Sequence, residues 1–284
     1  MSVVETSRGL WELLRPVNSF AAAVLTLIGG FVAGGLPAEA VVVTAAAVAT
    51  FLGTGAGNAI NDYFDRDIDA HNKPNRPIPR GAVTPAQSLW FSIACFAVAV
   101  ALALTLPWLA IAIAGVNLLA LVSYTQVFKG LPGAGNVVVA YLVGSTFLFG
   151  AAAAGDVEPA IVLFVLAALS TVSREIVKDV EDVAGDRKEG LNTLPIAYGE
   201  RTSLWVATAF LLVAILASPL PYLLGHFTEA YLVVVVPASA YMLFAARASF
   251  RDPAVGQSYL KYGMFLAALA FIVGRAAMYV DVPI

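Results

Sequence analysis

The chain has 284 residues, of which 60% are hydrophobic and only 12% are charged, and its formal net charge is −3. Soluble domains are about 45–50% apolar and about 25% charged, so a water-soluble globule of this size could not bury so much apolar surface. The composition excludes a soluble enzyme, a disordered chain and a nucleic-acid-binding protein, and it indicates a polytopic membrane protein.

The first predicted element is a short helix at the membrane surface near the N-terminus. Trp11, Leu13 and Leu14 lie between Arg8 and Arg15. Apolar and basic residues mixed in this way favour an interfacial helix over a cleaved targeting peptide.

Nine apolar segments follow, each close to the roughly 20 residues that a membrane-spanning helix needs. They are rich in Ala, Leu and Val and lack the alternating pattern of a membrane β-barrel. We therefore predict an all-α, polytopic fold with nine transmembrane helices. The segments are 17–36, 38–60, 86–106, 107–126, 135–154, 158–177, 203–222, 229–247 and 259–280.

Basic residues predict the orientation of these spans. All but one of the 16 Lys and Arg fall at the N-terminus or in and beside alternate connections, and Arg275 is the exception. The other connections carry only acidic charges, from Glu39, Asp156, Glu158 and Glu229. The positive-inside rule then places the N-terminus in the cytoplasm, and an odd number of spans places the C-terminus outside.

Two acidic segments, 58–80 and 175–197, follow the second and sixth apolar segments on the predicted cytoplasmic side. Both contain three aspartates separated by three and then four residues, with a constant offset of 117 residues. We interpret them as an internal pseudo-repeat whose two ends face each other. The aspartates are Asp62, Asp65 and Asp69 in the first segment, and Asp179, Asp182 and Asp186 in the second.

This spacing would place three carboxylates on one face of a helix. Like charges so close together repel unless cations neutralise them, and Mg²⁺ prefers such oxygen ligands. Asn61, four residues before Asp65, adds a neutral oxygen ligand. Basic residues in the same segments favour a site for Mg²⁺-bound diphosphate over a bare cation channel. The alternative interpretation is a set of ordinary solvated loop charges.

These motifs resemble those of the UbiA superfamily of membrane prenyltransferases. Asn61, Asp65 and Asp69 match the family's Asn-x-x-x-Asp-x-x-x-Asp motif, and Asp182 and Asp186 match its Asp-x-x-x-Asp motif. The resemblance covers nearly the whole chain. It implies a single domain over residues 1–284, with nine helices around a central cavity and both motifs on the cytoplasmic side of the cell membrane.

The sequences of residues 61–81 and 174–190 are similar to those of the archaeal ether-lipid branch of this family. That likeness implies transfer of a geranylgeranyl group from its diphosphate to the sn-2 hydroxyl of 3-O-geranylgeranylglyceryl phosphate, with release of diphosphate. An aromatic, chlorophyllide-like or carotenoid acceptor is the alternative, because chlorophyll synthase-like members share the Arg76-Pro-Ile-Pro phrase. A transporter is less favoured, since its charges would lie near the bilayer midplane.

The resemblance also implies roles for individual residues. Asp65, Asp69, Asp182 and Asp186 would be catalytic, together with Tyr124, whose ring would face an allylic cation or else belong to an interfacial belt. Two Mg²⁺ ions would be held by Asn61, Asp65, Asp69, Asp182 and Asp186, with Asp62 and Asp179 as further ligands or partners of ligands. Lys73, Arg76, Arg80, Lys178 and Arg187 would hold the diphosphate. The acceptor phosphate needs a second cationic site, for which Arg15 and Lys129 are our candidates; the alternative is that they anchor the chain at the membrane interface. Asn18 would line the pocket or else hydrogen-bond a neighbouring helix, and Arg174 completes the predicted substrate-binding set.

The predicted partners are an isoprenyl diphosphate, a lipid-like acceptor and membrane lipids. We expect no nucleic acid and no obligatory protein partner. No residue stands out in the sequence as a general base.

Overall fold

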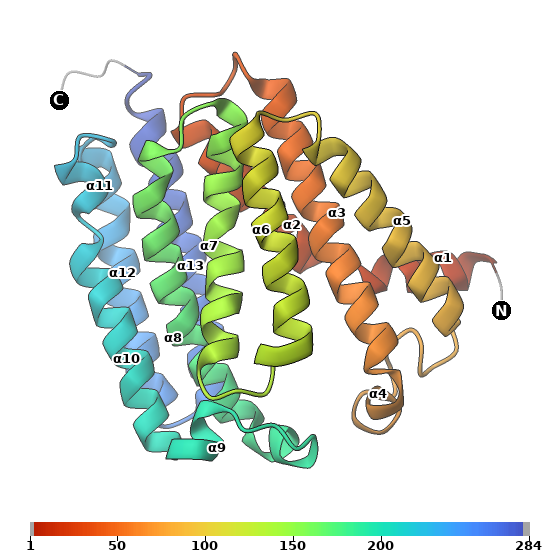
Figure 1. Ribbon diagram of the computed structural model, residues 1–284. Coiled ribbons are helices and arrows are strands. Elements are labelled where there is room, and N and C mark those ends of the chain that lie inside the picture. The colour runs from red at the N-terminus through yellow and green to blue at the C-terminus, as the bar shows by residue number, and fades with distance from the viewer. Residues whose placement is uncertain (1–2, 281–284) are drawn as a thin grey trace.

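The computed structural model describes residues 3–280, apart from the side chains of residues 68, 71, 72, 125 and 126. Over this range the chain forms only helices and connecting segments (Figure 1). The helices are α1 (Val3–Leu13), α2 (Pro16–Val32), α3 (Ala40–Phe64), α4 (Arg66–Asn72), α5 (Pro85–Ala103), α6 (Trp108–Ser123), the π-helix η1 (Tyr124–Phe128), α7 (Ala134–Ala154), α8 (Glu158–Lys188), α9 (Leu194–Tyr198), α10 (Glu200–Ala217), α11 (Leu220–Leu223), α12 (Glu229–Ser249) and α13 (Pro253–Ala276).

Seven helical segments of the described chain are long and apolar enough to cross a membrane: α3, α5, α7, α8, α10 with α11, α12 and α13. The pair α1 and α2, bent by 47°, is an eighth candidate. The remaining predicted segment, 107–126, corresponds to α6, which has 16 residues and continues into η1. The chain is therefore a multi-pass membrane protein, with seven or eight candidate spans by length and composition.

The bend between α1 and α2 confirms the short separate helix predicted at the N-terminus. It occurs at Arg15, which adopts the left-handed backbone conformation (φ 46°), and Pro16 then begins α2. A left-handed conformation is uncommon for a residue other than glycine, whereas proline suits the first turn of a helix. The bend leaves α1 at the edge of the bundle, in contact with α3 and α5, and places Arg15 between α1 and α2 (Figure 1).

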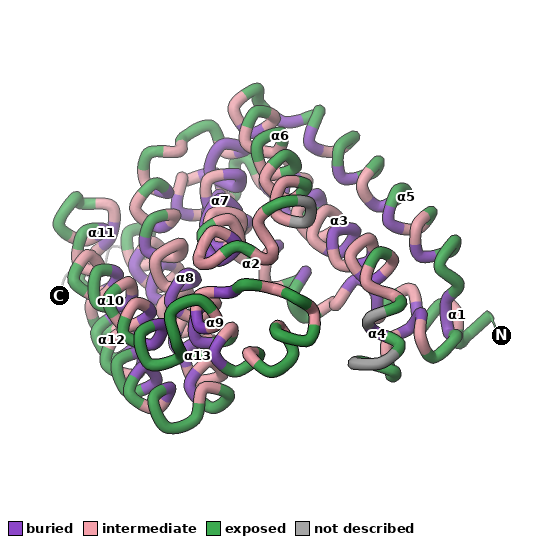
Figure 2. The backbone as a smooth tube through the Cα atoms, turned by 60° about the horizontal axis from the view of Figure 1, so that its bottom comes forward, coloured by how far each residue is buried: buried purple, intermediate pink, exposed green. Residues whose placement is uncertain are grey.

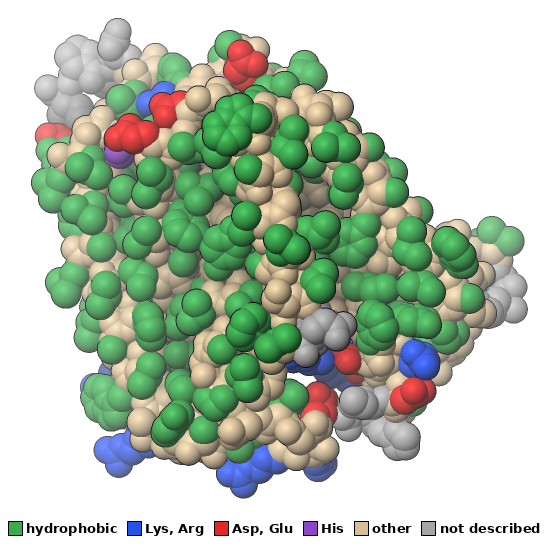
Figure 3. Space-filling view, viewed as in Figure 1, with side chains coloured by type: hydrophobic (Ala, Val, Ile, Leu, Met, Phe, Trp, Pro, Cys, Tyr) green, Lys and Arg blue, Asp and Glu red, His purple; other side chains and the backbone are tan. Residues whose placement is uncertain are grey.

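The molecular surface agrees with a membrane setting. Figure 3 shows a broad hydrophobic band on the visible face, with most of the visible Lys and Arg at the lower end and acidic side chains at both ends. The lower end is the one that carries α4 and α9 in Figure 1. The gathering of Lys and Arg at one end of the bundle is the pattern that the sequence predicts.

Glycines allow α2 and α7 to pack with their backbones in contact. A Cβ atom at Gly150 would lie 1.8 Å from the carbonyl oxygen of Thr26, and one at Gly29 would lie 2.1 Å from the carbonyl oxygen of Phe147. Small residues at such crossings are the usual means of close helix packing in membranes. This contact fixes two central helices against each other.

Substituting Gly150 with Ala is expected to destabilise the detergent-solubilised protein by about 2 kcal/mol, because the clashing atom belongs to the backbone and cannot rotate away. Thermal unfolding measures the effect. Gly53→Ala is the matched control: Gly53 is also helical, has nothing within 4 Å of its Cβ position, and should leave the unfolding midpoint unchanged or higher. An equal response of both variants would contradict the proposed contact.

The two acidic segments lie at the same end of the bundle (Figures 1 and 2). In the second, the three aspartates share one continuous helix, because α8 extends to Lys188. The first differs from the prediction. Helix α3 ends at Phe64 and α4 begins at Arg66, so Asp65 stands at a helix junction and the predicted stripe is interrupted there.

Candidate active site

A cavity of about 990 Å³ lies inside the bundle. Most of its lining is apolar, and Phe147, Tyr231 and Phe271 in this lining also belong to the buried core cluster. The lining includes side chains from both acidic segments, namely Asn61 from α3 and Asp182 from α8. The two motifs therefore meet at one cavity, as the pseudo-repeat suggested.

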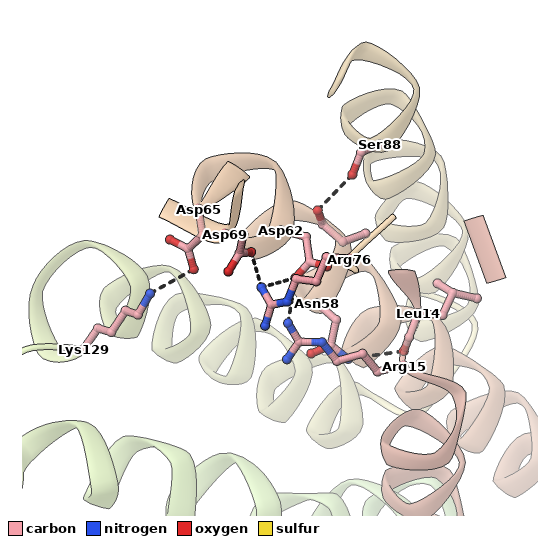
Figure 4. Close-up of polar contacts among 10 residues, drawn as sticks. Leu14, Arg15, Asn58, Asp62, Asp65, Asp69, Arg76, Ser88 and Lys129 are labelled. Carbon is pink, nitrogen blue, oxygen red and sulfur yellow. Dashed lines mark hydrogen bonds and ion pairs between the residues drawn. The ribbon is translucent and has the colours of Figure 1, made fainter. Parts of the chain in front are cut away.

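The first motif is held by arginines (Figure 4). Arg76 donates hydrogen bonds to Asp62 (3.1 Å) and to Asp69, and Arg15 donates to Asp62 from the other side (2.6 Å). Asp62 and Asp69 are only 4% and 3% exposed. Buried carboxylates require such partners, because an unpaired buried charge is very costly.

Asp65 has a different partner. The ammonium group of Lys129, directly after η1, donates to its Oδ2 at 3.0 Å (Figure 4). This ion pair joins the α3–α4 junction to the end of the α6–η1 segment. All three aspartates of the first motif are thus paired with cations, and Asn61 is the member of its matched motif that lines the cavity.

The second motif has neutral partners. The Asn136 side chain donates to Asp179 at 2.8 Å, and the Thr193 hydroxyl donates to Asp186 at 3.2 Å. Asp182 lies between them in sequence, is exposed and lines the cavity. The sequence prediction missed Asn136 and Thr193. A polar residue in an apolar segment was the available signal for Asn136.

Only some of the predicted substrate-binding residues line the cavity. They are Arg15, Asn18, Lys73, Arg174 and Lys178, and Tyr124, which was predicted as catalytic, lines it too. Arg80 lies elsewhere and pairs with Glu12 at 2.7 Å, Lys129 pairs with Asp65, and Arg187 is exposed near the end of α8. The structure therefore does not bring Arg80, Lys129 or Arg187 into the cavity wall.

A smaller hollow of about 520 Å³ adjoins the first motif. Arg15 and Lys73 line both this hollow and the cavity. Its other lining residues are Glu12, Asp62, Pro74, Asn75, Arg76 and Pro77. Arg76, which was predicted to bind the diphosphate, therefore lines this smaller hollow and not the main cavity.

The donor set fits magnesium in its chemistry. Asn61 and Asp182 offer hard oxygen atoms at the cavity, which also contains Lys73 and Lys178 as partners for phosphate. Within residues 3–280, no group of three or more His, Cys, Asp or Glu side chains forms a ready metal cage. Mg²⁺ commonly takes one or two carboxylates and completes its shell with substrate phosphates and water, so this sparse donor set suits it.

A helical bundle with two acidic motifs at one largely apolar cavity is the arrangement of a membrane enzyme for substrates with anionic heads and long apolar tails. The model of the UbiA prenyltransferase family matches residues 22–269, and the chain belongs to this family.

A digeranylgeranylglyceryl phosphate synthase of Natronomonas pharaonis is 63% identical over 276 residues, covering 97% of this chain and 99% of its own. A solved structure of a digeranylgeranylglyceryl phosphate synthase in membranes is 34% identical, with a TM-score of 0.82 and coverage of 96% and 99% of the two chains. A UbiA homolog from Archaeoglobus fulgidus, bound to DMAPP and Mg²⁺, shares the fold at 20% identity, with a TM-score of 0.74 and coverage of 95% and 99%.

Proposed function

We propose that this protein transfers a geranylgeranyl group from its diphosphate to the sn-2 hydroxyl of 3-O-geranylgeranylglyceryl phosphate. The observation that carries the proposal is the meeting of Asn61 and Asp182 at one largely apolar cavity. Its volume of about 990 Å³ is at the top of the usual range for ligand sites, as two lipid-like substrates require. Relatives such as that of Natronomonas pharaonis carry the name of this activity.

The two motif regions together hold the donor's diphosphate. Lys73 follows α4 and Lys178 lies on α8, so each of the two motif regions contributes a lysine to the cavity lining. Ammonium groups bind phosphate oxygens through strong charge-assisted hydrogen bonds. These contacts fix the diphosphate near the motifs, while the prenyl chain lies along the apolar walls.

Two Mg²⁺ ions complete this site in our proposal. Asn61, Asp65 and Asp69 would hold one, and Asp182 and Asp186 the other, with Asp62 and Asp179 beside them. When bound, the ions neutralise the negative charge that develops on the leaving diphosphate. Asp62, Asp65 and Asp69 are paired with Arg15, Arg76 and Lys129, so binding at the first motif requires these carboxylates to exchange ammonium or guanidinium partners for metal.

The reaction breaks the bond between C1 of the prenyl chain and its diphosphate oxygen, and the electron pair leaves with the diphosphate. The acceptor hydroxyl oxygen forms the new ether bond to C1, and its proton passes to the released diphosphate. Apolar walls keep water from the cationic carbon. Tyr124 lines the same cavity, and its aromatic ring is available to stabilise that positive charge.

We further propose nine spans, with the N-terminus and the active site on the cytoplasmic side of the cell membrane. The concentration of Lys and Arg at the end that carries the two acidic motifs supports this orientation. In a nine-span arrangement, α6 with η1 is the short fourth span.

An assay with purified protein in detergent tests the function. Labelled geranylgeranyl diphosphate is supplied with geranylgeranylglyceryl phosphate, 4-hydroxybenzoate or a chlorophyllide, with Mg²⁺ or with EDTA. We expect product only when geranylgeranylglyceryl phosphate is the acceptor. EDTA should abolish that product, and Mg²⁺ added in excess should restore it. Activity of the purified chain also tests the expectation that no protein partner is required.

Two results would count against the proposal. If no diphosphate were released with any of the acceptors, the enzymatic function would be contradicted. Product with an aromatic acceptor or a chlorophyllide, but not with the glyceryl phosphate, would retain the prenyltransferase class and replace the acceptor.

A further inference from the structure

A group of basic side chains lines the cavity where α8 and α13 pack together. It consists of Arg174 from α8 and Lys261 from α13, and we call it the α8–α13 cationic group. Glu175 beside it pairs with Arg174 (2.7 Å) and with Lys178 (3.8 Å). Because Glu175 offsets the charge of Arg174, the unbalanced positive charge of this group is that of Lys261.

Lys261 is placed deeply for a charged residue. It is the ninth residue of α13, which is one of the candidate spans, so it lies about 12 Å along the helix axis from Pro253. Its ammonium group lies 5.9 Å from the ring of Phe265. Among the described side chains, no carboxylate forms an ion pair with it. Ionisable residues at such a depth usually line substrate pathways.

The adjoining part of α8 carries polar atoms that lack partners. Arg174 uses its two terminal nitrogens for Glu175 and Gln257 (3.1 Å), while its buried Nε has no hydrogen-bond partner within the described chain. The hydroxyl oxygen of Thr171, a residue only 2% exposed, is also unpartnered there. Both residues line the cavity, so a ligand in it could satisfy these atoms.

The basic residues near the first motif are engaged differently. Arg15 pairs with Asp62 and Lys129 with Asp65, although the sequence assigned both to the acceptor phosphate. Lys73 also lies on that side, and we assign it to the donor's diphosphate, so the cation that remains for the acceptor is Lys261 on the α8–α13 side. A phosphate monoester is attracted by this charge, and its oxygens accept hydrogen bonds from guanidinium and ammonium groups.

We propose that the α8–α13 cationic group binds the phosphate of the lipid acceptor, and that Lys261 determines the preference for a phosphorylated acceptor. This inference rests on the proposed function and specifies which wall of the cavity holds the second substrate. The donor's diphosphate has the same phosphate chemistry, so the test must separate the two substrates.

The test measures steady-state kinetics of the full chain and of Lys261→Met, which keeps the side-chain length and removes the charge. The acceptors are geranylgeranylglyceryl phosphate and geranylgeranylglycerol, which lacks the phosphate. We expect KM for the phosphorylated acceptor to rise about 10- to 100-fold, with KM for geranylgeranyl diphosphate nearly unchanged. The preference for the phosphorylated acceptor should fall by the same factor.

Three further variants make the test specific. Lys261→Arg should keep most of the preference, and Lys261→Gln provides a second uncharged side chain if the methionine variant fails to fold. Arg201→Gln removes an exposed charge on α10 outside the cavity lining and should change neither KM.

The outcomes separate the two proposals. An active wild-type protein whose Lys261 variants raise KM for the donor instead, or retain the acceptor preference, would overturn this inference and leave the proposed function intact. A wild-type protein that makes no product from either acceptor would overturn both.

Discussion

Replacing Asp182 by Asn is expected to lower kcat for prenyl transfer about 10²- to 10³-fold, while the unfolding midpoint of the protein in detergent stays the same. Asp182 is exposed on α8 and lines the cavity that Asn61 also lines, so its carboxylate is available to a metal ion. Asparagine keeps the size of the side chain and removes its charge. Single-turnover kinetics with saturating substrates and Mg²⁺ measures the chemical step.

Glu181→Gln is the matched control, since Glu181 is the preceding residue, is also exposed, and does not line the cavity. It should keep nearly full activity. If both variants lost activity equally, a general effect of negative charge at this end of α8 would replace the metal site as the explanation. Full activity of Asp182→Asn would remove Asp182 from the site.

Replacing Arg76 by Met is expected to destabilise the protein by about 3 kcal/mol, the largest stability effect that we predict. Arg76 bonds to both Asp62 and Asp69, which are almost completely buried. Asp62 would keep Arg15, whereas Asp69 would lose the ionic partner that the structure gives it. Denaturant or thermal unfolding in a mild detergent measures the change.

A second substitution shows whether the unpaired charge is the cause. Arg76→Met combined with Asp69→Asn should recover much of the lost stability, because the neutral amide costs less to bury. Arg8→Met is the control: Arg8 pairs with Glu12 on the exposed surface, so its loss should cost less than about 1 kcal/mol. Strictly additive effects of the two substitutions at residues 76 and 69 would contradict the proposed pairing.

Much of the fold could be predicted because membrane spans are apolar and long. Each of the nine predicted segments overlaps a helix of the structure. The least accurate boundary is that of the sixth segment, which was placed at 158–177 whereas α8 continues to Lys188. Hydropathy indicates where the chain leaves the lipid, but it does not indicate where the helix ends. The charged part of α8 remains helical because Glu, Lys and Arg are good helix formers in water.

The site was predicted in part for a similar reason. Motif spacing identified Asn61 and Asp182, which line one cavity, but it could not show how loops fold back on the motifs. The pairing of Lys129 with Asp65 joins segments 64 residues apart, and Lys261 entered no motif at all. Tertiary contacts of this kind depend on how the helices pack, which the spacing of residues along one segment does not encode.

The length of α8 has a consequence for how the substrates are handled. Its 31 residues extend about 46 Å, whereas the hydrocarbon layer of a bilayer is about 30 Å thick, so the last turns reach into the headgroup zone. Asp182 and Asp186 lie on those turns. In the function that we propose, the diphosphate binds at these turns and stays close to water, so only the prenyl tail has to enter the hydrocarbon layer. This arrangement avoids the cost of moving a multiply charged anion into an apolar medium.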